Sequence, residues 1–148
     1  MPELLQGSTT PPTPDAAPAD DQLPPHLRGW LHLVCFFLSL PAGVVVVTSA
    51  GSGRARLAAA VYALGMTAMF GVSAAYHRGR WSPEGRVRMR RTDHGTILLM
   101  IAGSYTPFCL LTLDGTTARA VLVGVWAGAA VGFVVALTGV AEKAVVGL

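Results

Sequence analysis

The chain has 148 residues, of which 52% are hydrophobic and only 13% are charged, and its formal net charge is +3. A soluble domain usually carries about a quarter charged residues, so this composition is not that of a soluble globular domain. The charges are also segregated along the chain, and the mean hydropathy of +0.52 indicates a membrane protein.

The amino-terminal segment differs from the rest. Residues 1–28 hold seven of the ten prolines, together with Ser, Thr, Ala and Asp. Such a segment cannot bury a core, so we expect a disordered arm. It does not read as a signal peptide, because Glu3 precedes any cation and no apolar core follows. Residues 29–148 are predicted to form one transmembrane domain.

Four apolar stretches without charges follow the arm. Each is long enough to cross the roughly 30 Å hydrocarbon core of a bilayer as a helix, and none has the polar face that a helix of a soluble bundle needs. The sequence therefore predicts an all-α fold, a polytopic transmembrane helix bundle. Its predicted spans cover about 30–50, 57–77, 93–113 and 120–141.

Prolines and turn residues predict kinks within these spans and turns between them. Pro41 is expected to kink the first span near mid-membrane, where neighbouring helices can satisfy the freed carbonyl. The Ser104–Pro107 segment is expected to kink the third span or end it early. Asp114 and Gly115 form a turn signal before the fourth span.

Arginines cluster between the second and third spans, in a predicted 15-residue loop over 78–92. A basic cluster between two apolar spans is typical of a cytoplasmic loop beside anionic lipid headgroups, and no nucleic-acid partner is expected. With this loop inside, eight Lys or Arg residues are cytoplasmic and three are external, so the positive-inside rule predicts a cytoplasmic amino terminus. The loop arginines are Arg78, Arg80, Arg86, Arg88, Arg90 and Arg91.

Small residues recur every fourth position in the fourth span. Such a ridge lets helix backbones approach closely, so helix packing is the preferred interpretation, and a homo-oligomer through its glycines is a further possibility. The ridge consists of Ala120, Gly124, Gly128, Gly132 and Ala136.

Polar residues stand where the second span ends and the third begins. Ser73 and His77 are four residues apart and share one helix face. Asp93 opens the third predicted span at the same membrane surface. We therefore expect the three residues to converge just inside the cytoplasmic boundary. Polar and ionisable groups in apolar spans are candidates for a functional site.

Each residue also has a purely structural interpretation. Ser73 can bond back to a carbonyl of its own helix. His77 and His94 can sit among headgroups, and Asp93 can be the N-cap of the third span.

Metal binding is the chemistry that these residues suit best. A neutral imidazole is a standard zinc ligand, and zinc lowers the pKa of its bound water toward about 7, which provides hydroxide for hydrolysis. His77 is the convincing ligand, because His26 lies in the arm and His32 on another helix. The ligand set is therefore incomplete. A Ser-His-Asp nucleophilic triad is a weaker alternative, because no nucleophile elbow surrounds Ser73.

At these residues the chain resembles the hemolysin III family, which belongs with the adiponectin and progestin receptors, the PAQR group. The matching motifs are Arg28–His32, Ser73–Arg78, Asp93–Ile97 and Ile101–Pro107, within about residues 26–143. The resemblance implies a seven-helix fold in the bacterial plasma membrane with its amino terminus in the cytoplasm.

The same resemblance implies a zinc ion near the cytoplasmic side. His77 would be a direct ligand, and Ser73 and Asp93 would surround the metal-bound water. Two more histidines, spaced H-x-x-x-H, would come from a seventh helix. The implied activity is hydrolysis of a membrane lipid amide or ester, and the alternative is a pore-forming or lytic protein without catalysis.

This chain departs from the family pattern in two places. The acidic and asparagine residues often found before the first-span histidine are absent. The sequence also ends at Leu148, after four predicted helices and without the H-x-x-x-H motif. We expect either a fragment, a truncated gene, or helices supplied from elsewhere.

Overall fold

The computed structural model describes residues 29–139, and every regular element in that part of the chain is a helix. The helices are α1 (Trp30–Ser49), α2 (Gly53–Arg78), α3 (Pro83–Leu111) and α4 (Gly115–Thr138). All four are long and apolar enough to cross a membrane. The predicted all-helical, four-span fold is thus confirmed. The predicted arm, residues 1–28, lies outside the described residues.

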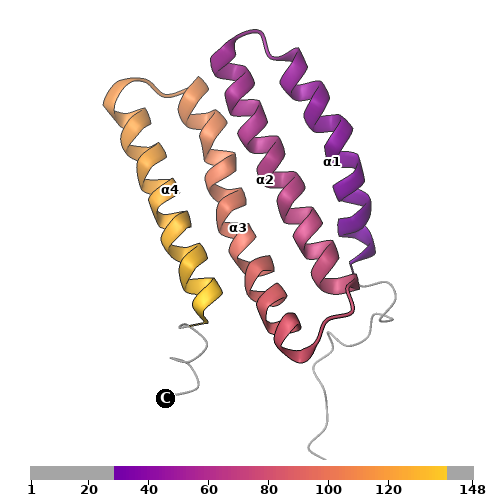
Figure 1. Cartoon of the computed structure of the whole chain (residues 1–148). Helices are drawn as coiled ribbons and strands as arrows, with labels where there is room; N and C mark the ends of the chain where they lie inside the picture. Colours follow the sequence, from indigo (N-terminus) through magenta and orange to yellow (C-terminus); the bar gives the residue numbers. More distant parts are fainter. Residues whose placement is uncertain (1–28, 140–148) are drawn as a thin grey trace, which may run out of the picture.

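The helices run alternately up and down in a single layer (Figure 1). Among the described residues, each helix packs only against its neighbours in sequence: α1 on α2, α2 on α3, and α3 on α4. The buried apolar residues are all small, alanines and Cys109, whereas many Leu, Val and Phe side chains are exposed. An exposed apolar surface of this kind suits contact with lipid. Both faces of the layer and the outer flanks of α1 and α4 therefore remain uncovered by the described part of the chain.

Glycines allow the neighbouring helices to approach closely. A Cβ placed on Gly43 would lie 3.0 Å from the Ala63 Cβ, and one placed on Gly95 would lie 2.6 Å from the Phe133 ring. Only part of the predicted ridge on α4 lies against a neighbouring helix. Gly132 contacts Leu98 of α3, whereas Gly124 and Gly128 have open space around them within the described structure.

Hydrogen bonds between side chains also join the helices. The Ser39 and Thr67 hydroxyls lie 2.9 Å apart across α1 and α2. The Trp126 indole N–H donates to the Thr106 hydroxyl at 3.1 Å across α3 and α4. Such bonds add a modest stabilisation between helices in lipid, about 0.6 kcal/mol on average.

The connection between α2 and α3 is short, so the predicted 15-residue loop is wrong. Helix α3 begins at Pro83, and the Ser82 hydroxyl caps it by accepting from the Gly85 N–H at 3.1 Å. Serine followed by proline is a normal helix start. The arginines that follow made this segment look like a loop on hydropathy alone. With 29 residues, α3 is about 43 Å long, so it extends beyond the apolar core.

Two other sequence predictions can be compared with the helix bounds. Helix α3 does not end at Pro107 but continues through it to Leu111. The predicted turn before α4 is present. Asp114 precedes the helix, and Gly115 has a φ of +61°, a left-handed value that favours glycine.

Candidate functional site

One end of the layer collects the polar residues that the sequence singled out. This end, here called the basic end, is where α1 begins, α2 ends and α3 begins, and it is the lower end in Figure 1. His32 comes from the first turn of α1, and Ser73 and His77 come from the last turns of α2. Asp93 comes from α3.

Ser73 is held by a partner from another helix. Its hydroxyl lies 2.7 Å from the His32 Nδ1 atom, and either atom can be the donor, depending on the histidine tautomer. Ser73 is only 6% exposed. The hydrogen bond found for the Ser73 hydroxyl thus joins it to His32 of α1 and not to a carbonyl of its own helix. The His32 ring also packs near the Phe70 ring, with 5.8 Å between centroids.

His77 lies next to this pair and is exposed. Its ring centroid is 6.4 Å from that of His32 and 4.8 Å from that of Tyr76. As the last turn of α2 is the negative end of the helix dipole, a cation beside it is favoured. Gly29 brings the start of α1 against His77. A Cβ at Gly29 would lie 2.7 Å from the His77 Cβ, and its φ of +78° favours glycine.

The helix register places Asp93 at the depth of Ser73. Gly65 lies beside Met100, and Gly103 lies beside Val61. Extending this antiparallel register by about two turns brings Asp93 level with Ser73. Asp93 is half-buried, but no hydrogen bond or ion pair joins it to Ser73 or His77.

Asp93 is not the N-cap of a helix, so that structural interpretation is wrong. It lies inside α3, well after the cap at Ser82. Its backbone carbonyl accepts a hydrogen bond from the Thr96 hydroxyl at 2.7 Å. The need for a capping residue therefore does not explain a carboxylate at this position.

His94 is set apart from these residues. It is exposed, and its Nδ1 atom lies 2.7 Å from the backbone carbonyl oxygen of Arg90, one turn earlier in α3. Its ring is thus anchored to its own helix. This local contact agrees with the interpretation of His94 as an interfacial residue.

The donors at the basic end can be compared with the requirements of a zinc site. Zinc takes three or four protein ligands, and imidazole nitrogen is a preferred one. Within residues 29–139, no group of three or more His, Cys, Asp or Glu residues lies close enough to hold a metal ion. His77 offers one exposed imidazole at this end. Residues 29–139 therefore do not make a complete zinc site on their own.

His32 is the residue that sequence reasoning set aside. His32 lies on another helix than His77, but that helix, α1, is the antiparallel neighbour of α2. The connection from Ala50 to Ser52 is very short. When two antiparallel helices are joined by a short connection, residues that lie at similar sequence distances before and after it come side by side. His32 and Ser73 are two such residues. The alignment of α1 with α2 across this short connection is the sequence feature that predicts the contact.

Comparisons with known proteins agree with this fold. A family model described as "Haemolysin-III related" matches residues 22–147. The curated protein Hemolysin-3 of Bacillus cereus is 33% identical over 98 residues, which are 64% of this chain and 44% of that relative. The chain thus spans less than half the length of this relative. No solved structure matches. With its four apolar helices, the chain is a multi-pass bacterial membrane protein that belongs to the haemolysin-III-related family.

Proposed function

We propose that this protein contributes to a membrane-embedded, zinc-dependent hydrolase that cleaves a lipid amide or ester at the cytoplasmic leaflet. One observation carries the proposal. His32, Ser73 and His77 meet at the basic end, and Asp93 lies at the same depth on the neighbouring helix. Ionisable groups are costly beside hydrocarbon, and a cluster of them at one depth points to a function.

Each side chain has a distinct role in this proposal. His77 is exposed and free to offer a ring nitrogen as one metal ligand. When bound, zinc would supply a nucleophile at neutral pH by acidifying water. The Ser73 hydroxyl, oriented by His32, holds the attacking water. The Asp93 carboxylate accepts the proton that this water loses and returns it to the leaving amine or alcohol. The remaining ligands would come from outside residues 29–139.

Metal content tests the proposal directly. The full-length protein, with any further helices that its native reading frame encodes after Leu148, is purified into lipid nanodiscs, and bound zinc is counted by elemental mass spectrometry. We expect about one zinc per chain, lost in His77→Ala because a first ligand is removed. His94→Ala is the matched control, since His94 lies at the same end but is bound to its own helix. A wild-type chain without zinc, or a His77→Ala variant with unchanged zinc, would contradict the proposal.

Pore formation is the second candidate function, and one observation favours it. Gly124 and Gly128 face open space, so this part of the ridge on α4 could receive a helix of a second copy. Gly132 of the same ridge already contacts Leu98. In this case dye leakage from liposomes would survive His77→Ala but fail in Gly128→Leu. Absence of leakage at every protein density would exclude this function.

A further inference from the structure

A groove of about 390 Å³ opens between α1 and α2 at the basic end. Its walls are apolar along most of its length, and its mouth carries a cation and an indole. The apolar lining comes from Leu33 and Phe36 of α1 and from Gly71, Ala74 and Ala75 of α2, and the mouth is formed by Arg78, Gly79 and Trp81.

The mouth of this groove is held in place by specific contacts. The Arg78 guanidinium lies 4.7 Å from the centroid of the Trp30 ring, a cation–π distance. The Trp81 indole N–H donates to the Ala75 carbonyl at 3.1 Å. Trp81 therefore folds back over the end of α2. Two tryptophans and an arginine form a typical set at the boundary between hydrocarbon and headgroups.

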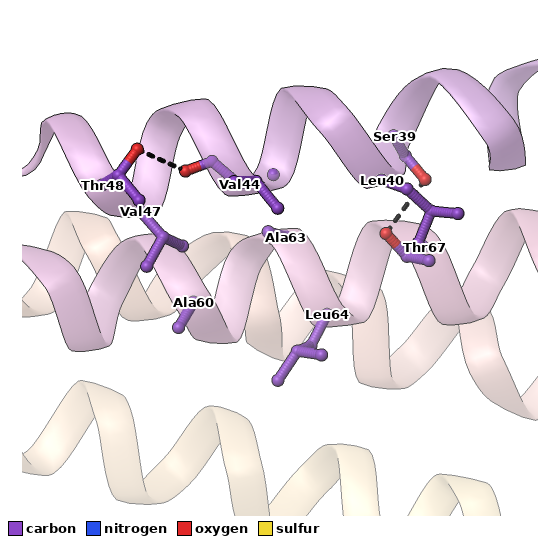
Figure 2. Close-up of a pocket in the computed structure, with 10 residues that line it drawn as sticks. Ser39, Leu40, Val44, Val47, Thr48, Ala60, Ala63, Leu64 and Thr67 are labelled. Carbon is purple, nitrogen blue, oxygen red and sulfur yellow. Dashed lines mark hydrogen bonds between the residues drawn. The ribbon is translucent and has the colours of Figure 1, made fainter.

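A second groove of about 400 Å³ lies further along the contact between α1 and α2. Figure 2 shows its lining, with the Ser39–Thr67 hydrogen bond at one side. Helical spacing places Leu40 on the same face of α1 as Leu33, and Leu64 on the same face of α2 as Gly71. The two grooves thus follow one another along one face of this helix pair.

The length of this path matches one leaflet of a bilayer. Arg78 and Thr67 are 11 residues apart on α2, which is about 16 Å along the helix axis. Half of the hydrocarbon core is about 15 Å. An acyl chain that begins beside Arg78 and follows the groove would therefore reach the membrane midplane near Thr67.

We infer that this path binds an anionic phospholipid of the cytoplasmic leaflet. Its phosphate lies against Arg78, and one acyl chain fills the apolar groove toward Ser39 and Thr67. Within residues 29–139, the recorded partner of the Arg78 guanidinium is the Trp30 ring and not a carboxylate, so its charge is available to an anion. This binding is independent of the proposed hydrolysis, because it requires neither zinc nor turnover.

Native mass spectrometry of the full chain in detergent tests the inference. Phosphatidylglycerol and phosphatidylcholine with identical acyl chains are added in turn, and bound lipid is counted. We expect one phosphatidylglycerol to be retained in preference to phosphatidylcholine. Arg78→Gln should weaken its binding about fivefold, the effect of one cation beside an anionic headgroup. Ala75→Leu should also weaken it, since this exposed position lines the groove and the larger side chain fills it.

Arg119→Gln is the matched control, because this exposed arginine lies near the start of α4. Helix α4 begins at the opposite end of the layer (Figure 1). Circular dichroism shows whether each variant keeps its helices. Equal retention of the two lipids would overturn the inference. Wild-type affinity in a folded Arg78→Gln or Ala75→Leu variant would overturn it as well. So would an equal loss in Arg119→Gln, since that would indicate non-specific attraction.

Discussion

The His32 Nδ1 atom and the Ser73 hydroxyl oxygen lie 2.7 Å apart and join the first turn of α1 to the end of α2. This contact fixes both the depth and the direction of the Ser73 side chain, one helical turn from His77. It also sets the register between two helices whose other contacts are mostly between small or apolar side chains. The same hydrogen bond thus serves the fold and the candidate site.

Removal of this hydrogen bond should destabilise the helix pair. His32→Ala leaves the buried Ser73 hydroxyl without its partner, which should lower the free energy of unfolding by about 1 kcal/mol. Ser73→Ala should cost a similar amount, and the double variant should cost less than the sum of the two. The measurement is unfolding in mixed micelles, followed by circular dichroism. Additive losses, with a coupling energy near zero, would show that the contact contributes nothing to stability.

Gly29 should tolerate substitution poorly, since its backbone has a φ of +78° and His77 leaves no room for a Cβ. Gly29→Ala should lower the free energy of unfolding by about 1–3 kcal/mol, the range for a non-glycine residue in an unfavourable backbone region. Thermal unfolding of the two proteins measures this change. Gly51→Ala is the matched control, because Gly51 has no atom near its Cβ position and lies outside the left-handed region. Equal melting temperatures for Gly29→Ala and wild type would refute this account.

The serine cap should determine where α3 begins. Ser82→Ala removes the acceptor of the Gly85 N–H and should cost about 1 kcal/mol of local stability. Hydrogen exchange should become faster in the first turn of α3 and stay unchanged in α4. Thr116→Ala serves as the control, since this exposed residue in the first turn of α4 caps nothing. Unchanged exchange around Gly85 would mean that Pro83 alone defines the start of the helix.

The apolar stretches determine most of this fold, which is why the four helices and their order can be predicted from the sequence. The start of α3 was missed because Arg86 and Arg88 lower the local hydropathy, although the Ser82–Pro83 pair is a helix-start signal. Hydropathy detects the part of a helix that lies in hydrocarbon, and α3 extends beyond that part.

The sequence predicts only part of the candidate site. The i, i+4 spacing placed Ser73 and His77 on one face, and the helix register brings Asp93 to their depth. The contact with His32 required the pairing of α1 with α2, which no periodicity within one helix can reveal. The open space at Gly124 and Gly128 was also beyond prediction, since a ridge of small residues does not say which neighbour covers it.

Asp93 provides the sharpest test of the proposed chemistry. Asp93→Asn keeps the size of the side chain but removes the group that accepts a proton from water. It should lower the rate of fatty-acid release from a labelled ceramide or acyl ester by about 100-fold or more, while zinc content and helicity stay at wild-type values. Asp114→Asn is the matched control, since Asp114 precedes α4 at the opposite end of the layer. An Asp93→Asn protein that hydrolyses lipid at the wild-type rate would exclude Asp93 as the base. A zinc-loaded wild-type protein that releases no fatty acid from either lipid would exclude the proposed hydrolysis itself.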